Sequence, residues 1–235
     1  MNDPKPDFDA LSGSYEELLK DPLRDRFTGG ASEFFHVRKC DLMRDFFRRR
    51  QVDTRALSYL DIGCGKGELL TLLREDFEQV CGCDPSPGML AAGGLGAKGI
   101  QTCVQQDPRK LPYDDARFDV ITAVCVYHHV APDLRLSLTR EVRRVLKPGG
   151  WFAIIEHNPF NPVTRFIVGR TPVDANAILL RPSEARQLLH DGGFRVEAQQ
   201  YFLYCPERWY RMFGGVEAAL RGIPLGGQYA VFGRW

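Results

Sequence analysis

A glycine-rich turn is the first feature of this chain that points to ligand binding. The segment Leu60-Asp61-Ile62-Gly63-Cys64-Gly65-Lys66-Gly67 follows an apolar run of strand length and precedes a leucine-rich helical pattern. Glycine lets the backbone turn sharply and lets a ligand approach without obstruction by a Cβ atom. Asp84 ends the next apolar run, twenty-one residues after Gly63, where a carboxylate can accept both hydroxyls of a ribose. The spacing predicts a site for a ligand that contains a nucleoside.

The spacing within the turn separates two classes of such ligand. Dinucleotide-binding turns follow G-x-G-x-x-G and place a pyrophosphate on the helix N-terminus, whereas this chain has G-x-G-x-G with Asp61 just before it. A carboxylate there would repel a pyrophosphate and would suit a cationic ligand that carries an amino group. A nicotinamide oxidoreductase is therefore disfavoured, and a tight turn that binds nothing stays as a further alternative.

The elements that must position these residues alternate along the chain. Apolar runs of strand length predict strands over 56–62, 79–83, 100–105, 118–127, 151–156, 194–203 and 229–232. Helical spacing or stop signals predict helices over 14–20, 31–50, 87–92, 134–146 and 183–190, with another directly after the glycine turn. Residues 157–182 show no clear period. Strands that alternate with helices predict an α/β fold with a parallel, doubly wound sheet.

Composition limits the class of protein and its partners. The 235 residues are 44% hydrophobic and 26% charged, which excludes a wholly disordered or fibrous chain and fits one α/β domain with appended segments. The formal net charge of +1 gives no long-range attraction to nucleic acid or to an anionic membrane. There is no signal-peptide pattern at the start and no run of 18 apolar residues. Seven cysteines, an odd number without a CxxC pair, favour a reduced cytoplasmic protein without structural zinc.

Five segments in order resemble the successive motifs of class I S-adenosylmethionine-dependent methyltransferases. They are Leu60 to Gly67, Asp84, Gln106-Asp107, Phe118-Asp119-Val120-Ile121 and Arg144-Val145-Leu146-Lys147-Pro148-Gly149-Gly150. The resemblance covers roughly residues 55–157. It implies a seven-stranded sheet of order 3-2-1-4-5-7-6 with strand 7 antiparallel, and S-adenosylmethionine as the cofactor.

The resemblance also implies roles for individual residues. Asp61 and the turn would hold the methionine part of the cofactor, Asp84 the ribose and Asp107 the adenine amino group. Met89 resembles the apolar residue that packs on the adenine. Pro108 departs from the small residue common at that place, and proline has no N–H to donate. The full expected cofactor-binding set is Tyr15, Asp61, Gly63, Cys64, Gly65, Asp84, Pro85, Met89, Gln106, Asp107, Pro108 and Cys125.

Histidines follow two strands that are neighbours in this order. Strand 4 ends in Tyr127-His128-His129-Val130 and strand 5 in Glu156-His157. A histidine oriented by Glu156 would serve as general base, so His128, His129 and Glu156 are the candidate catalytic residues. Side chains alternate along a strand, so we expect one histidine of the pair to face the reacting methyl. We favour His128, with His129 packed toward the helix start at Pro132. A core or capping histidine and a His-His-Glu metal site stay as alternatives, and no metal is expected.

The segment after strand 5 is the expected acceptor side. Its His157-Asn158-Pro159-Phe160 is similar to the Asn-Pro-Pro-aromatic signature of enzymes that methylate nucleic-acid amino groups, but it has one proline fewer and follows a different strand. A loop that walls the acceptor pocket is the better interpretation. Arg165, Arg170 and Arg181 would bind an anionic acceptor there, unless they only form a solvated face. The aromatic residues of 201–204 and 209–210 line the same pocket or belong to the core.

Together these features predict a methyltransferase that moves a methyl group to oxygen, nitrogen or carbon of a small-molecule acceptor. We expect a single domain over 1–235, with a helical lid over 1–51, a cofactor-binding core over 52–235 and a substrate-side insertion over 157–182. Expected partners are the acceptor and at most a second copy of the chain, with neither nucleic acid nor membrane. The alternative is a protein that binds the cofactor or its product without methyl transfer, as a regulator or a non-methylating cyclase.

Overall fold

The computed structural model describes residues 8–19, 22, 25, 33–174 and 176–235. Its strands form one sheet of order β3-β2-β1-β4-β5-β7-β6. Strand β7 runs antiparallel to both β5 and β6, and the other neighbours are parallel. The expected strand order is thereby confirmed. The strands are β1 Ser58–Ile62, β2 Gln79–Asp84, β3 Gln101–Val104, β4 Phe118–Val124, β5 Leu146–His157, β6 Arg195–Phe202 and β7 Gln228–Arg234.

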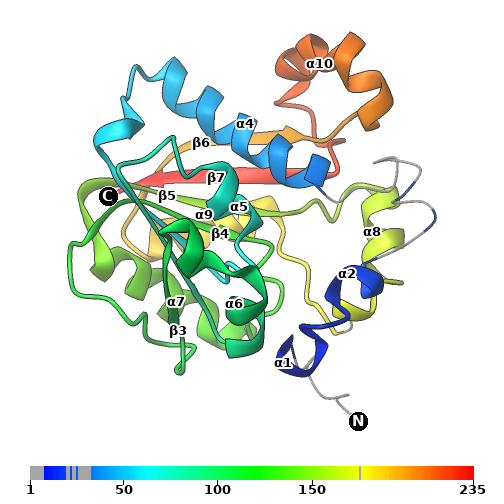
Figure 1. The fold of residues 1–235 in the computed structure, drawn as a ribbon. Helices are drawn as coiled ribbons and strands as arrows, with labels where there is room; N and C mark the ends of the chain where they lie inside the picture. The colour runs from blue at the N-terminus through cyan, green and yellow to red at the C-terminus, as the bar shows by residue number, and fades with distance from the viewer. Residues whose placement is uncertain (1–7, 20–21, 23–24, 26–32, 175) are drawn as a thin grey trace.

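Helices cover both faces of this sheet (Figure 1). The α-helices are α1 Phe8–Leu11, α2 Tyr15–Leu18, α4 Glu33–Arg49, α5 Glu68–Leu72, α6 Pro87–Gly93, α7 Pro132–Val145, α8 Pro162–Val168, α9 Pro182–Asp191 and α10 Glu207–Leu220. Three short 3₁₀ helices are η1 Thr54–Ala56, η2 Leu95–Lys98 and η3 Pro172–Asp174. In the described parts of the chain, no helix has the length and apolar character needed to cross a membrane.

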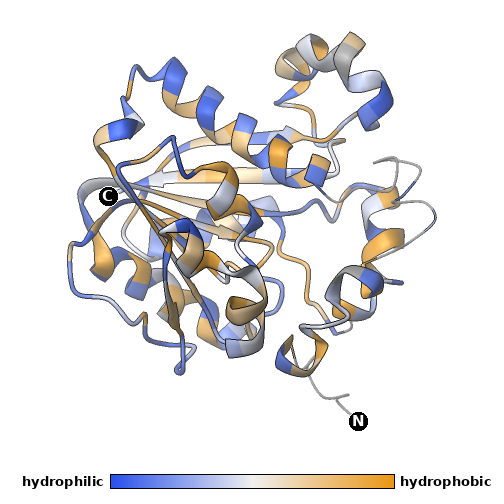
Figure 2. Ribbon diagram, viewed as in Figure 1, coloured by the Kyte–Doolittle hydropathy of each residue, from blue (hydrophilic) through white to orange (hydrophobic). Residues whose placement is uncertain are grey.

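Alternation along β1 divides the core between the two faces. Leu60 and Ile62 pack with Leu138 of α7 in one cluster, while Tyr59 packs with α4 in the other. Phe46 of α4 is fully buried, and its ring stacks at a centroid distance of 3.7 Å on the ring of Phe232 in β7. Figure 2 shows hydrophobic residues throughout the central strands and a mixture of both kinds along α4. Helix α4 is therefore a layer of the core, although the sequence assigned it to a lid.

Helices α1 and α2 lie beyond the carboxyl ends of the parallel strands, together with α8 (right side of Figure 1). Asp9 of α1 connects this segment to α6, because its Oδ1 accepts hydrogen bonds from Ser86 Oγ at 2.9 Å and from the Gly88 N–H at 2.6 Å. No residue of α1 is buried. The short helices therefore form a cover on the ligand edge of the sheet and do not belong to the core.

Four local predictions differ from the structure. Strand β4 ends at Val124 and not at 127, because Cys125 takes a left-handed conformation with φ of +57°. The predicted stop at 147–150 is already part of β5, which begins at Leu146 and shifts register against β4. Helices α8 and α10 were not predicted. Helix α8 begins with Asn161, whose side chain accepts from two backbone N–H groups, and with Pro162 in its first turn.

Candidate active site

One cavity of about 890 Å³ lies at the carboxyl ends of β1, β2, β4 and β5. The glycine turn and Asp84 form one part of its wall, and the turn after β4 with η3 forms another. Phe8 of α1 and Tyr15 of α2 close it from the cover. Pockets of this volume accommodate ligands of nucleoside size or larger. The cavity therefore brings the two predicted parts of the site into one enclosed space.

The glycines of the turn adopt backbone conformations that other residues rarely take. Gly63 and Gly65 have φ of +64° and +55°, in the left-handed region that favours glycine. The N–H groups of Gly63 and Cys64 both donate to the Cys83 carbonyl, which fixes the turn to the end of β2. A Cβ atom on Gly63 would lie 2.5 Å from a methyl carbon of Val126. The turn is therefore fixed against β2 and close to the loop after β4.

Asp61 is a buried carboxylate on the wall of this cavity. Its Oδ1 accepts a hydrogen bond from Thr122 Oγ1 at 2.6 Å, and the Tyr59 hydroxyl lies 2.6 Å from the same Thr122 oxygen. Burial raises the pKa of Asp61 to about 7, although the Thr122 hydrogen bond and the charge of Lys39 act in the opposite direction. Such a carboxyl group gains its charge readily when a cation binds beside it.

Asp84 lies directly behind the glycine turn. Its Oδ2 accepts from the Gly65 N–H and its Oδ1 from the Ser86 N–H, both at 2.8 Å. Burial raises the pKa of Asp84, and these two hydrogen bonds oppose that effect. The bonds fix the carboxylate at the end of β2, where Asp84 lines the cavity.

Most of the other expected cofactor residues also line the cavity. They are Tyr15, Cys64, Pro85, Met89, Gln106, Pro108 and Cys125. Asp107 is the exception, since it is exposed and its Oδ1 accepts from the Arg109 N–H at 2.8 Å in a local turn. The cavity wall passes through its neighbours Gln106 and Pro108, so the structure does not place the Asp107 carboxylate on it.

Asp119 and Lys147, which belong to the methyltransferase motifs, support the sheet and do not line the cavity, and both contact Ser58. Asp119 Oδ2 accepts from the Ser58 N–H at 2.9 Å and from Lys147 Nζ at 2.7 Å. Burial acts to raise the pKa of Asp119, but the hydrogen bonds from Lys147 and Ser58 hold it below its ordinary value. These contacts join the amino ends of β1, β4 and β5, opposite the ligand edge.

His128 and Glu156 form the predicted pair on neighbouring strands. His128 Nδ1 lies 2.5 Å from Glu156 Oε2, and both side chains are buried. Burial would lower the pKa of His128, but the charges of Glu156 and Asp174 raise it well above its usual value. In turn, His128 holds the pKa of Glu156 below its usual value despite burial. The expected orientation of one imidazole by Glu156 is therefore present.

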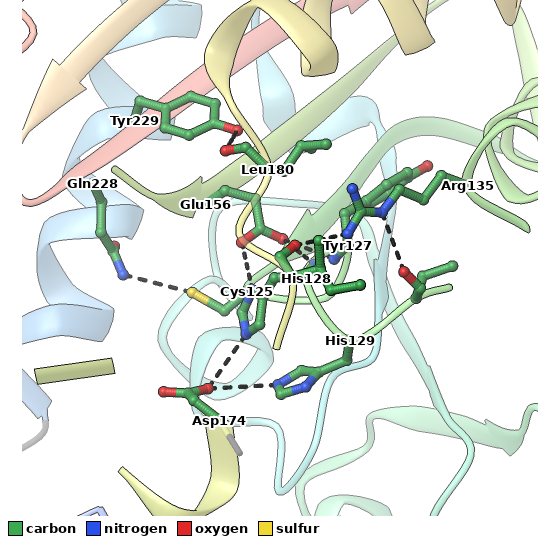
Figure 3. A network of polar contacts seen from close by, with 12 residues as sticks. Cys125, Tyr127, His128, His129, Arg135, Glu156, Asp174, Leu180, Gln228 and Tyr229 are labelled. Atoms are coloured by element: carbon green, nitrogen blue, oxygen red, sulfur yellow. Dashed lines mark hydrogen bonds and ion pairs between the residues drawn. The ribbon is translucent and has the colours of Figure 1, made fainter. Parts of the chain in front are cut away.

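The expectation that the two histidines point in opposite directions is wrong. The rings of His128 and His129 lie 4.1 Å apart, and Asp174 Oδ1 is 3.4 Å from His128 Nε2 and 3.6 Å from His129 Nε2 (Figure 3). The alternation rule fails because β4 ends at Val124 and both histidines lie in the following turn. His129 lines the cavity, and the centroid of its ring is 5.1 Å from that of Phe8.

The charged wall residues that the sequence did not assign to the site include Asp174 and Lys39. Asp174 lies in η3, within the segment that lacks a period, and nothing near it in the sequence distinguishes it from a loop acid. Lys39 of α4 is buried and lines the cavity, where its charge lowers the pKa of Asp61. A lysine on the apolar side of a helical pattern is the signal that could have identified it. The arginines at 165, 170 and 181 are not among the residues that form this wall.

Comparison with known proteins agrees with this geometry. A family profile described as a methyltransferase domain matches residues 60–154. A 2-phytyl-1,4-naphthoquinone methyltransferase of Synechococcus elongatus is 35% identical over 172 residues, which cover 67% of this chain and 68% of that protein. The chain belongs to the class I S-adenosylmethionine-dependent methyltransferases. S-adenosylmethionine is thus the cofactor, as expected, and the nicotinamide alternative is dropped.

Further relatives of this methyltransferase differ in their named activities. A ubiquinone biosynthesis O-methyltransferase of Coxiella burnetii is 30% identical over 160 residues, covering 63% of this chain and 67% of that protein. The chain thus spans about two thirds of the length of these curated relatives. A solved Thermotoga maritima structure, described as a possible histamine N-methyltransferase, matches with a TM-score of 0.68 over 97% of both chains at 18% identity. That last likeness supports the fold alone.

Proposed function

We propose that this methyltransferase moves the methyl group of S-adenosylmethionine to a small-molecule acceptor by in-line displacement. The observation that carries the proposal is the single cavity, which joins Asp61 and Asp84 at one end to the histidines at the other. A donor bound against the glycine turn would direct its sulfonium toward the turn after β4. Holding the acceptor at attack distance in an enclosed site then supplies much of the rate.

The cofactor part of the proposal assigns one task to each polar group. Asp61 would accept the cationic α-amino group, because its buried carboxylate gains most from a positive partner. Asp84 would accept the ribose hydroxyls from its place behind Gly65. Met89 and Pro108 would enclose the adenine, with Gln106 on the same wall.

The acceptor part places the reaction beside the histidine pair. A lone pair of the acceptor attacks the methyl carbon, the carbon–sulfur bond breaks, and its electrons stay on sulfur as the thioether of S-adenosylhomocysteine. The sequence favours His128 as the base, but its side chain is only 1% exposed against 23% for His129, so we assign the acceptor proton to His129 instead. Burial and the charge of His128 lower the pKa of His129 to about 4, so its ring is unprotonated near neutral pH and can accept a proton. The Nδ1 atom of His128 is hydrogen-bonded to Glu156, so we propose that these two residues position the site and do not take the proton.

Small-molecule acceptors are supported by the relatives, whose names refer to a naphthoquinone and to ubiquinone biosynthesis. The net charge of +1 gives no reason to expect nucleic acid. We also propose that the protein acts in the cytoplasm as a monomer or a homodimer. The rival function is cofactor binding without transfer, which a buried site of this kind would also allow.

Formation of S-adenosylhomocysteine with panels of phenols, hydroquinones and amines tests the proposal. His129→Ala should lower turnover by roughly 10²–10⁴-fold with unchanged cofactor affinity. His190→Ala is the matched control, because that histidine is exposed on α9. Equal turnover in the two variants would remove His129 from the reaction. Tight cofactor binding with no product from any acceptor class would favour the rival function.

A further inference from the structure

Three potential metal ligands converge on the acceptor side of the cavity. One ligand atom from each of His128, His157 and Asp174 can be chosen so that all lie within 4.8 Å of one another. The three residues come from the turn after β4, the end of β5 and η3, and all of them line the cavity. Side chains from three separate segments therefore meet at one point that a small molecule can reach.

His128 has the arrangement of a metal-bound imidazole. Its Nδ1 lies 2.5 Å from Glu156 Oε2, while its Nε2 is buried and has no hydrogen-bond partner among the described residues. Histidines that bind metals commonly donate their other ring N–H to a carboxylate, which orients the ring and fixes its tautomer. A buried nitrogen without a hydrogen bond is costly, and a metal ion between it and Asp174 would satisfy it.

The distance between His128 and Asp174 also fits two ligands of one metal ion. Nε2 and Asp174 Oδ1 are 3.4 Å apart, without hydrogen-bond geometry. Two ligands on one tetrahedral ion with bonds of about 2.0–2.1 Å are separated by about 3.4 Å. Two carboxylates, the buried Glu156 and the partly buried Asp174, would also balance the charge of a divalent cation with the histidines neutral.

We propose that His128 Nε2, His157 and Asp174 bind a divalent transition-metal ion of the Zn²⁺ class, with Glu156 as the hydrogen-bond partner of His128. Two imidazoles and one carboxylate suit such an ion, whereas Mg²⁺ prefers oxygen ligands. Three protein ligands leave a coordination position open. Because all three ligand residues line the cavity, an oxygen or nitrogen of the acceptor could reach a bound ion.

This inference departs from the expectation of no metal, and the fold explains the difference. The metal site that the sequence left as an alternative consists of His128, His129 and Glu156. In the structure, Glu156 is hydrogen-bonded to Nδ1 of His128 and so supports the ring. The third ligand is Asp174, far along the chain in the segment without a period. The use of the open position by an acceptor rests on the proposed function, whereas metal binding itself does not.

The test is calorimetric titration of the untagged, chelator-treated full chain with Zn²⁺, repeated with Co²⁺ followed by its visible absorbance. We expect one ion per chain. Asp174→Asn and His157→Ala should each weaken binding at least tenfold. Glu156→Gln should weaken it by about 10–100-fold, because it alters the hydrogen bond that orients the His128 ring. His190→Ala should bind like the unaltered chain, because its exposed ring is on α9.

Circular dichroism of every variant separates lost ligands from lost folding, and Asp174→Asn is the variant that changes the core least. The proposal is overturned if the folded chain binds neither ion, or if Asp174→Asn and His157→Ala bind as tightly as the unaltered chain. S-adenosylmethionine binding is measured on the same metal-free sample. A chain that binds the cofactor but no metal overturns this site alone, whereas failure to bind the cofactor counts against the proposed function.

Discussion

Asp61 shows how one residue can couple cofactor binding to pH. Its carboxyl group is buried between Thr122 and the cavity, and burial raises its pKa to about 7. The charge of Asp84 acts in the same direction, while that of Lys39 acts against it. In the empty site the group is therefore about half protonated near neutral pH. An ammonium group of the cofactor would bind the ionised form.

We predict that S-adenosylmethionine affinity falls as the pH drops below about 7, by about tenfold per pH unit. Below this pKa the carboxyl group must release a proton before it can pair with the ammonium group, so binding competes with protonation. Above it the affinity should level off. Calorimetry across this range measures the effect, and Asp61→Asn should bind weakly with a flat profile. A dissociation constant for the unaltered chain that does not change with pH would contradict this role.

Site residues could be predicted where a short stretch of sequence carries the signal for ligand binding. Asp61, Gly63 and Asp84 lie at strand ends beside a distinctive turn, so spacing alone placed them at the ligand edge. Asp174 was not predictable, because its role comes only from the packing of η3 against the turn after β4. The Asp107 carboxylate is not on the cavity wall, since it accepts the Arg109 N–H in a local turn, so its contact with the adenine stays a prediction.

At the scale of elements, α4 belongs to the core. Phe46 is fully buried, stacks on Phe232 and meets the ring of Trp151 at a centroid distance of 5.2 Å. We predict that Phe46→Ala lowers the free energy of unfolding by about 3–5 kcal/mol, because it removes a large buried ring and leaves a cavity. Urea denaturation measures this change. Arg48→Ala, on the exposed side of the same helix, should stay within about 0.5 kcal/mol. If both variants lost similarly little free energy of unfolding, α4 would not be part of the core and the lid interpretation would stand.

The cover formed by α1 and α2 should behave in the opposite way. Removing residues 1–19 takes away Phe8 and Tyr15 from the cavity wall, and with them Asp9, which joins α1 to α6. No residue of α1 is buried, so the remaining chain should unfold at nearly the same urea concentration. Turnover should fall by about tenfold or more, because water then enters the site. Full activity in the shortened chain would show that this segment is not a lid.

The sequence predicted most elements but missed specific boundaries for physical reasons. Strands with apolar runs and helices with a clear period were found within a few residues, because burial on the sheet sets both patterns. The end of β4 was misplaced, since Val126 and Tyr127 continue the apolar run after the backbone has already turned at Cys125. Helix α10 carries exposed apolar residues such as Met212 and Val216, so its pattern gave no clear polar face.

At the scale of the whole molecule, one continuous cavity joins the two sides of the site. The cofactor side is built by β1, β2 and the glycine turn, and the acceptor side by the turn after β4 with η3. Methyl transfer needs both sides at once, whereas cofactor binding needs only the first. Methyl transfer and mere cofactor binding are therefore distinguished by whether the methyl group has left S-adenosylmethionine after incubation with the protein.

The most direct test follows a radiolabelled methyl group from S-adenosylmethionine into a fractionated cell extract. The account predicts that the full chain moves label into the small-molecule fraction, with S-adenosylhomocysteine formed in equal amount. Asp84→Ala should reduce this transfer, because the proposed contact between Asp84 and the ribose would be lost and cofactor binding would weaken by about 1.5–3 kcal/mol. Tight binding of the cofactor with no transfer, or label found in protein or nucleic acid instead, would contradict the central claim.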